Sequence, residues 1–567
     1  MEKRVLLAVS LSFVVLFVYQ SLFVKPVQRP TGVRAGASSK STPGERPKAS
    51  HRQTPTTGIA APETPSAPAA VVGANREHDI VVESAEVRAI FTNRGAELKS
   101  WILKHFFDDR GRPVDLVPRE SQGDRLPGEP RGFGLVIDDR ELTERLRSVL
   151  YRATTDSLQV GPQGARLVFD YQDAAGLSVR KQFDFRADGH PYLVAFSADI
   201  TRGGQSLRAS VSSGPGLGDT DRATGGSFLS PAYYQKPQGI YSLGGKVARL
   251  RGTDLAKQPR YEGTYRYVGA DDHYFLGVVL PAGRNTRVDY RVMNVETALG
   301  PRELVAYDAR VAGGIRDVRL FLGPKQFDAL AKVDPELTKV INFGIFAWLV
   351  VPLLRSLNWV HGFVGNYGWS IIILTVLINA AMFPLRHKSV VSMRKLQELQ
   401  PEVKAIQERY AKLKATDPAR QKMNVELMNL YRERGVNPAS GCVPMLLTFP
   451  VLFAFYSLLS QAIEIRGAPF VGWITDLSTH DPWYVTPLLM GATMVWQQRM
   501  TPTTADPVQQ KMLMFMPLIF TFMFLWAPSG LVIYWFVSNL WAIGQQYLTN
   551  YLIGPPATRA ARRPSAA

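Results

Sequence analysis

The sequence lacks the residues that several protein classes require. It contains a single cysteine, Cys442, so no intrachain disulfide can form. Because neither a second thiol nor a histidine cluster lies nearby in the sequence, Cys442 is interpreted as a small packing residue. A glycine-rich phosphate loop ending in Lys-Ser or Lys-Thr is also absent. The sequence therefore predicts no nucleotide site and no other cofactor.

Charge pairs and internal repeats are missing from five long apolar runs near the C-terminus. Transporters and channels for small solutes typically carry intramembrane charge pairs or inverted repeats, so this absence counts against that class. A spanning helix needs about 20 mostly apolar residues, and the third and fourth runs are short enough to indicate a locally thinned bilayer. The five runs are Trp369–Leu385, Val443–Ile463, Trp483–Trp496, Met512–Trp526 and Leu531–Ile553.

The N-terminus contains one more apolar run, Val5–Val24, which follows Lys3 and Arg4 and carries no charge. It exceeds the core of a cleavable signal and ends in a poor cleavage site, so residues 1–24 are predicted to be an uncleaved anchor with a cytoplasmic N-terminus. Residues 25–75, rich in Pro, Ser and Thr, are predicted to be a disordered linker on the extracytoplasmic, periplasmic side of the membrane. The basic residues of this linker oppose the positive-inside rule, which weakens for long translocated regions.

Residues 76–330 show strand patterns. Short runs such as Val87–Phe91 and Val179–Phe185 alternate apolar with polar residues and are separated by turn residues. One large β-sandwich explains a region of this size more economically than two small domains. The cluster Asp271-Asp272-His273-Tyr274 admits acid–base chemistry. Because adjacent residues on a strand point to opposite faces, the junction of a strand and a loop is the preferred interpretation.

Residues 335–362 admit two interpretations, a spanning helix or an amphipathic helix lying in the membrane interface. Phe343–Leu354 is apolar but short, and Pro352 interrupts it. A spanning helix would place residues 386–434, with twelve Lys/Arg against six Asp/Glu, outside the cell. That placement opposes the positive-inside rule, so the interfacial helix is favoured. The sequence then predicts six spans and two cytoplasmic termini.

The net charge by itself does not identify the partner of this protein. The formal charge of +18 admits a nucleic acid, but no RNA-binding motif is present and much of the Lys/Arg excess flanks apolar runs. No specific nucleic-acid partner is expected. Residues 386–434 are predicted to form a cytoplasmic helical hairpin with one apolar seam, whose basic outer face is a candidate contact for lipid headgroups or a ribosome. Residues 554–567 form a basic cytoplasmic tail.

Two polar side chains, Thr375 and Asn379, interrupt the first of the five runs. Their spacing of four residues puts both on one face of a helix. A polar group that faces lipid is costly, so this stripe is expected to face other helices or a water-filled cavity. A bundle with such a lining is able to hold a polar groove within the membrane.

Short motifs in the last part of the chain carry a specific resemblance. In this order they resemble the YidC branch of the YidC/Oxa/Alb membrane protein insertases, in its Gram-negative form, over roughly residues 340–553. The motifs are Val436-Asn437-Pro438, Gly441-Cys442, Pro444, Pro450, Glu464-Ile465-Arg466, Ala468-Pro469-Phe470, Trp473-Ile474-Thr475-Asp476-Leu477-Ser478, Asp481-Pro482, Met500-Thr501-Pro502, Asp506-Pro507, Gln509-Gln510-Lys511, Phe515-Met516-Pro517, Pro528-Ser529-Gly530-Leu531 and Ser538-Asn539.

The resemblance implies a fold class and a location. The fold is a polytopic α-helical membrane protein, with a five-helix insertase core at residues 363–553 and an N-terminal anchor helix, joined to a large all-β periplasmic sandwich. For residues 76–330 the resemblance implies a β-supersandwich related to sugar mutarotases, without known catalysis. The location it implies is the bacterial inner membrane.

A substrate groove is the functional site that the resemblance implies, lined by Thr375, Asn379, Tyr534 and Trp535. The family usually carries an arginine at the position of Asn379, so this chain departs from the family pattern there. An asparagine keeps hydrogen-bonding capacity but brings no fixed charge. An interhelical hydrogen bond within the bundle is the alternative interpretation of Asn379.

The function implied is that of an insertase and chaperone for integral membrane proteins, acting alone or with the Sec translocon, and not that of an enzyme. The partners expected are nascent membrane proteins, the Sec translocon and membrane lipids, with the ribosome and the signal recognition particle receptor as further candidates. A solute transporter and a tethered sugar-active enzyme are the competing classes. The transporter class would require charge pairs within the apolar runs, and the sequence has none there. The enzyme class leaves the five apolar runs unexplained.

Overall fold

The computed structural model describes residues 71–108, 110–117, 131–185, 190–217, 235–297, 300–410, 419–435, 443–500 and 507–553. The predicted anchor at 1–24, nearly all of the linker and the basic tail at 554–567 lie outside these residues. The end of the predicted linker is part of the β domain, since Val72 N–H donates to Gln172 O at 2.9 Å and Ala74 N–H donates to Leu150 O at 3.1 Å. The domain therefore begins a few residues before the predicted boundary at residue 76.

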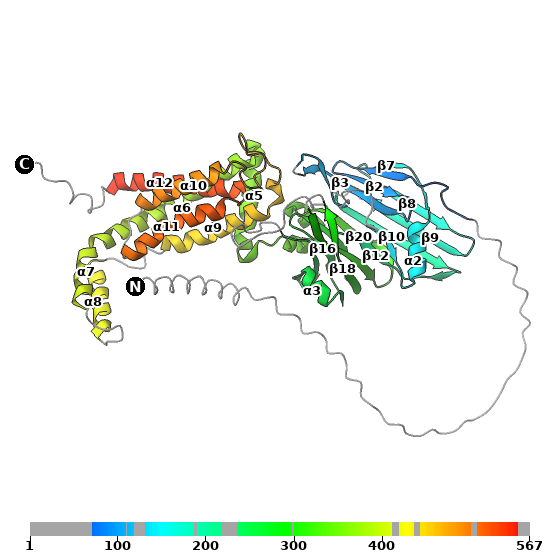
Figure 1. The fold of residues 1–567 in the computed structure, drawn as a ribbon, viewed down its shortest axis with the longest axis horizontal. Helices are drawn as coiled ribbons and strands as arrows, with labels where there is room; N and C mark the ends of the chain where they lie inside the picture. The colour runs from blue at the N-terminus through cyan, green and yellow to red at the C-terminus, as the bar shows by residue number, and fades with distance from the viewer. Residues whose placement is uncertain are drawn as a thin grey trace, which may run out of the picture. The chain divides into compact units, whose positions relative to one another are not determined.

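The first part of the chain from Val71 onward is a β domain of three sheets (Figure 1). One five-stranded sheet has the order β4(Pro113–Asp115), β3(Glu97–Phe107), β2(Val87–Thr92), β1(Asp79–Glu83), β7(Ser157–Gln159). The other has the order β15(Arg260–Gly263), β18(Thr286–Thr297), β19(Gly300–Val311), β12(Ser210–Ser213), β5(Leu135–Val136). The ten-stranded sheet has the order β14(Lys246–Leu250), β13(Gln238–Leu243), β16(Tyr267–Asp271), β17(Phe275–Leu280), β20(Ile315–Pro324), β10(Leu193–Arg202), β9(Leu177–Phe185), β8(Ala165–Gln172), β6(Arg152–Ala153), with β11(Gln205–Ser206) paired to β10.

Both small sheets pack against the large one. Phe91 of β2 and Phe183 of β9 have ring centroids 4.9 Å apart. From the second small sheet, the Tyr307 hydroxyl group donates to Gly277 O of β17 at 3.1 Å. Strand β9 shows the cause, because its residues alternate between buried and partly exposed positions as a pleated strand requires. The predicted sandwich is confirmed as β-rich, and it contains the short helices α2(Arg140–Ser148) and α3(Gly252–Lys257).

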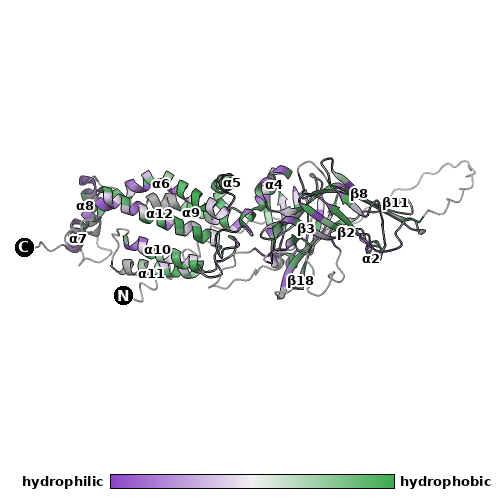
Figure 2. Cartoon of the chain, turned by 90° about the horizontal axis from the view of Figure 1, so that it is seen from above, coloured by the Kyte–Doolittle hydropathy of each residue, from purple (hydrophilic) through white to green (hydrophobic). Residues whose placement is uncertain are grey.

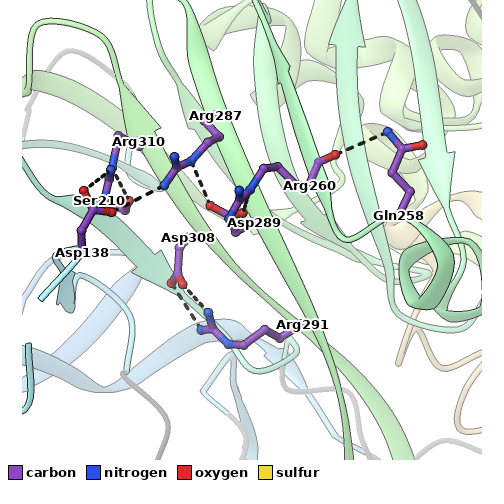
Figure 3. A network of polar contacts seen from close by, with 9 residues as sticks. All are labelled: Asp138, Ser210, Gln258, Arg260, Arg287, Asp289, Arg291, Asp308 and Arg310. Carbon is purple, nitrogen blue, oxygen red and sulfur yellow. Dashed lines mark hydrogen bonds and ion pairs between the residues drawn. The ribbon is translucent and has the colours of Figure 1, made fainter. Parts of the chain in front are cut away.

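The second small sheet carries a network of ion pairs (Figure 3). Asp289 accepts from Arg260 at 2.5 Å and from Arg287 at 3.2 Å, and Asp138 accepts from Arg310 at 2.7 Å. Exposed or half-buried pairs of this kind contribute about 0–1 kcal/mol each, so the network adds little to the stability of the sheet.

Between the β domain and the long helices lies the region predicted as one interfacial helix at 335–362. It consists of α4(Phe327–Val333), the 3-10 helices η1(Pro335–Val340) and η2(Gly344–Phe346), and α5(Ala347–Val364). The prediction of a single helix from residue 335 is therefore wrong at its start, where Asp334 and Pro335 favour a separate short turn. One face of α5 is buried through Val350, Leu354 and Leu357, while Trp348, Trp359 and Phe363 are exposed.

The C-terminal part is a helical bundle of α6(Tyr367–Glu398), α9(Val443–Gln461), α10(Val485–Met500), α11(Pro507–Phe524) and α12(Ser529–Ile553). All five predicted runs correspond to helices, although their ends shift by several residues. The first apolar run ends at Leu385 and the predicted hairpin begins at Arg386, and α6 continues through both, past Pro384 to Glu398. Among the described residues, one helix segment, Tyr367–Leu396, is both long and apolar enough to span a membrane, and Phe449–Gln461 and Met514–Phe524 are shorter apolar helices.

The predicted hairpin exists in its described part as the end of α6 with α7(Gln400–Arg409) and α8(Ala419–Glu433). Leu396, Val403 and Ile406 from the predicted seam are buried, and Arg409 forms an ion pair with Glu426 at 2.6 Å. Asp417-Pro418, an N-cap and first-turn proline that predict the break between the two helices of the hairpin, lies outside the described residues. Figure 2 shows hydrophobic residues along α6, α9 and α11 and hydrophilic residues over α7 and α8.

Candidate functional site

The two polar residues predicted on α6 are buried inside the bundle. Thr375 is 0% exposed and Asn379 is 4% exposed. Thr375 Oγ1 donates to Ile371 O at 2.6 Å, and Asn379 Nδ2 donates to Thr375 O at 2.8 Å. These bonds within the helix leave Asn379 Oδ1 as an acceptor for another group. The stripe therefore faces protein, as a polar group in an apolar helix must.

Arg386 supplies that other group. Its Nη1 donates to Asn379 Oδ1 at 2.9 Å. Seven residues correspond to nearly two helical turns, about 10.5 Å, and helical side chains lean toward the N-terminus, so the long arginine side chain reaches back along the same face. Sequence reasoning placed Arg386 at the helix end and missed this contact. The spacing of seven from Asn379 was the available signal.

The predicted aromatic pair of α12 points to two different neighbours. The Tyr534 ring is buried and stacks on Phe455 of α9 with centroids 4.3 Å apart and planes at 8°. Trp535 packs against Phe524 of α11 at 4.9 Å. Tyr534 lies within electrostatic range of the Arg386 guanidinium. Tyr534 therefore lies on the side of α12 that meets α9 and Arg386, whereas Trp535 lies on the side that meets α11.

Helices α6 and α12 run parallel, side by side. Near their N-terminal ends a Cβ at Gly530 would lie 3.3 Å from Ile371 Cδ1, and toward their C-terminal ends His387 Nδ1 lies 3.3 Å from Thr549 Oγ1. Further along, Arg394 bonds to Asn550. We call the facing surfaces the polar seam. It comprises the stripe of Thr375, Asn379 and Arg386 on α6 together with Tyr534, Trp541, Gln545 and Thr549 of α12.

Another buried asparagine of α12 belongs to a different contact. Asn539 Nδ2 lies 3.3 Å from Thr493 Oγ1 and 3.4 Å from Met490 O, both on α10. Asn539 therefore joins α10 to α12 away from the polar seam. Asn539 thus makes a hydrogen bond between two helices outside the polar seam, whereas Asn379 lies within the seam.

A carboxylate organises the loop that precedes α10. Asp481 accepts hydrogen bonds from Trp473 Nε1 at 2.9 Å, from Trp483 N at 2.9 Å, and from Thr486 N and Oγ1, both at 2.8 Å. Burial by itself would raise the pKa of this carboxyl group, but the hydrogen bonds outweigh it and lower the pKa. Asp481 thus fixes the entry into α10.

The cluster Asp271-Asp272-His273-Tyr274 forms the turn between β16 and β17, as the preferred interpretation predicted. Asp272 Oδ1 accepts from the N–H groups of Tyr274 and Phe275, and Asp271 pairs with the buried Lys325. His273 Nε2 lies 2.8 Å from Ser460 O of α9. The turn therefore connects the β domain to the helical part.

Arg466 makes the matching contact from the helical side. Its guanidinium group lies 5.1 Å from the Tyr274 ring centroid and 5.0 Å from that of Phe275. We call His273, Tyr274, Phe275 and Arg466 the joint.

A helical bundle with exposed apolar side chains, joined to a β domain, is the architecture of a membrane protein that carries a large domain outside the bilayer. Comparisons with known proteins agree. Residues 359–555 match the family model described as the 60Kd inner membrane protein, and residues 79–356 match the YidC periplasmic domain. The chain belongs to the YidC family of membrane protein insertases, which are inner-membrane proteins with a periplasmic domain.

Individual relatives cover nearly the whole chain. The membrane protein insertase YidC of Geotalea daltonii is 34% identical over 561 residues, covering 97% of this chain and 99% of the relative. That of Geobacter metallireducens is 35% identical over 572 residues, covering 97% and 98%. Among solved structures, an active YidC insertase crystal structure is 19% identical and covers 85% of this chain and 94% of the other, with a TM-score of 0.33, too low to carry an argument.

Proposed function

We propose that this protein inserts nascent membrane proteins into the inner membrane along the polar seam between α6 and α12. Asn379 lies twelve residues into α6, about 18 Å from its start, which corresponds to the middle of a bilayer about 30 Å thick. A hydrophilic stretch of a client that reaches this depth has less hydrocarbon left to cross. The apolar segment of the client then leaves toward lipid, and its own transfer energy drives the step.

The observation that carries this proposal is the Arg386–Asn379 hydrogen bond within the seam. The sequences of α6 between Tyr367 and Leu396 and of α9, α10, α11 and α12 contain no Asp or Glu. The seam therefore carries positive charge without a fixed charge at position 379. In this chain we propose that Arg386 supplies the cation two turns further along, and that Asn379 holds it.

Topology and partners follow from the same proposal. We propose six spans, formed by the anchor and the five apolar helices, with α5 in the membrane interface, both termini in the cytoplasm and the β domain in the periplasm. Clients reach the seam alone or from the Sec translocon. The basic faces of α7 and α8 lie where lipid headgroups, a ribosome or the signal recognition particle receptor would approach. Tyr534 and Trp535 would contact the client.

The test compares two buried asparagines of the same bundle. Asn379→Leu dries the seam and removes the acceptor for Arg386, whereas Asn539→Leu removes an interhelical bond of α10 and α12. Both lose a bond worth about 0.6–2 kcal/mol, so both variants are expected to fold. Insertion of a single-span client into proteoliposomes, at matched amounts of folded protein, should drop for Asn379→Leu and stay near the parent for Asn539→Leu. Equal insertion by the parent and Asn379→Leu contradicts the role of the seam.

A further inference from the structure

Gln545 lies in the polar seam without the hydrogen bonds that its amide requires. It is 7% exposed, and neither its Nε2 nor its Oε1 has a hydrogen-bond partner among the residues that the structure describes. An unsatisfied buried polar group costs about 1–3 kcal/mol. The carboxamide of Gln545 presents both a donor and an acceptor, so the cost of leaving it unpaired falls on two atoms.

The neighbouring glutamine shows that this state is specific. Gln546 is buried to a similar degree, and its Nε2 donates to Asn550 Oδ1 at 3.1 Å. Asn550 in turn bonds to Arg394 of α6, so Gln546 is satisfied within the bundle although it also lies close to α6. The unpartnered carboxamide is therefore particular to Gln545 and is not shared by its neighbour in the described part of the chain.

Trp541 adds a second unpartnered group on the same face. Its Nε1 is buried and has no hydrogen-bond partner in the described part of the chain. Tyr534, Trp541, Gln545 and Thr549 follow one another at spacings of seven, four and four, which keeps them on one side of a helix. Since Thr549 lies against His387, this side faces α6. Trp541 precedes Thr549 by eight residues, and Asn379 precedes His387 by eight residues. Because α6 and α12 run parallel, Trp541 and Asn379 lie at about the same depth.

We propose that Gln545 and Trp541 form a binding strip for the main-chain amide groups of the client segment that crosses the seam. A side-chain carboxamide is the same functional group as a peptide bond, so it accepts from a client N–H and donates to a client C=O. The indole N–H of Trp541 donates to a second carbonyl oxygen about one turn away. A segment not yet folded into a helix carries such unpaired groups, and leaving them bare in hydrocarbon is costly.

Recognition of the main chain also suits the task, because clients differ in side chains but share the peptide backbone. This inference rests on the proposed function of the seam and names the client group that it binds.

The experiment uses the full-length protein in proteoliposomes and two synthetic single-span clients. One has an ordinary main chain, and the other is N-methylated at alternate residues of its translocated segment, which removes N–H donors. Insertion is measured as the rate at which the segment becomes protected from protease. For the ordinary client, Gln545→Leu should lower the rate about fivefold, the effect of losing about one hydrogen bond. For the N-methylated client, the same variant should have a clearly smaller effect.

Thermal unfolding separates this role from a structural one. Gln545→Leu removes an unsatisfied polar group, so its Tm should equal or exceed that of the parent. Gln546→Leu, the matched control, leaves Asn550 with fewer partners, so its Tm should fall while both clients keep the same rate ratio as with the parent. If Gln545→Leu folds poorly, Gln545→Met keeps the side-chain length and serves in its place.

Two results would overturn the inference. An equal loss with both clients would mean that Gln545 only hydrates the seam, and no loss with either client would mean that it takes no part in insertion. Failure of the seam proposal is a distinct result, in which the parent inserts neither client above empty liposomes or Asn379→Leu inserts both at the parental rate.

Discussion

Single residues at the loops of this protein respond to pH in ways that sequence alone does not show. Glu464 lies between α9 and α10 in the 3-10 helix η4(Ile463–Ile465). Burial raises the pKa of its carboxyl group to about 7, and Asp328 adds to the rise, although the N–H groups of Glu464 and Phe327 oppose it. The folded protein therefore prefers Glu464 protonated.

Glu464→Gln should change the pH dependence of stability. Because the folded pKa exceeds the ordinary value of 4.5, the contribution of this group is fully present below about pH 4.5 and is lost as pH rises through about 7. The variant should show a Tm that falls less than that of the parent between pH 5 and pH 8, and it should be the more stable protein at pH 8. Parallel Tm profiles of the two proteins would contradict this prediction.

The cation proposed for the polar seam also depends on single residues. Asn379 replaces the arginine that the resemblance implies, and Arg386 reaches it through a hydrogen bond of 2.9 Å. The sequence contained both residues, but the direction of the Arg386 side chain depends on its neighbours in the bundle.

Among the elements, helices α10 and α11 pack closely at Gly491, because glycine has no Cβ there. A Cβ at Gly491 would lie 2.1 Å from Thr521 Oγ1 and 3.0 Å from Thr521 Cγ2. Gly544 of α12, in contrast, has no atom within 4 Å of the position of a Cβ. The two glycines thus differ in what surrounds them, although both lie in apolar helices.

Gly491→Leu should separate α10 from α11 and destabilise the bundle by about 1–3 kcal/mol, the usual cost of overpacking. Gly544→Leu is the matched control and should leave the Tm unchanged or slightly higher, since leucine favours the helix over glycine. The measurement is thermal unfolding in detergent, followed by circular dichroism. A similar Tm for both variants would show that the α10–α11 contact is not tight.

At the scale of the whole molecule, the two features to consider are the joint between the β domain and the helical part and the membrane topology. In the joint, His273 of the β16–β17 turn lies against Ser460 of α9, and Arg466 lies against the Tyr274 ring of the same turn. A cluster that looked reactive in the sequence thus has a structural role in the fold.

Two-sided labelling tests the proposed topology. The label must be placed at exposed residues on each side of the membrane. In the loop before α10, Thr475 is exposed, whereas Ser478 is only 2% exposed and would label poorly. On the other side, Asn424 of α8 is exposed. In a Cys442→Ser background, Thr475→Cys should react with an impermeant maleimide from the periplasm, and Asn424→Cys should react only after the membrane is opened. Labelling of both from the same side would contradict the arrangement of spans.

Periodicity and composition in the sequence determined much of this protein. Alternating strands predicted the β domain, and five apolar runs predicted the five long helices, because burial of apolar surface is encoded locally. The spacing of Thr375 and Asn379 was enough to place both inside the bundle. The continuation of α6 through Pro384 to Glu398 was not apparent from the sequence, because the apolar run ends at Leu385 while the helix does not.

Only the tertiary structure decided which residues meet. The reach of Arg386 to Asn379, the split of Tyr534 and Trp535 between α9 and α11, and the contrast between Gln545 and Gln546 all depend on how helices distant in sequence pack. The same holds for His273, which contacts Ser460 across 187 positions of the chain. A local pattern specifies which face of a helix is polar, but the partner of that face is set by the packing of the whole bundle.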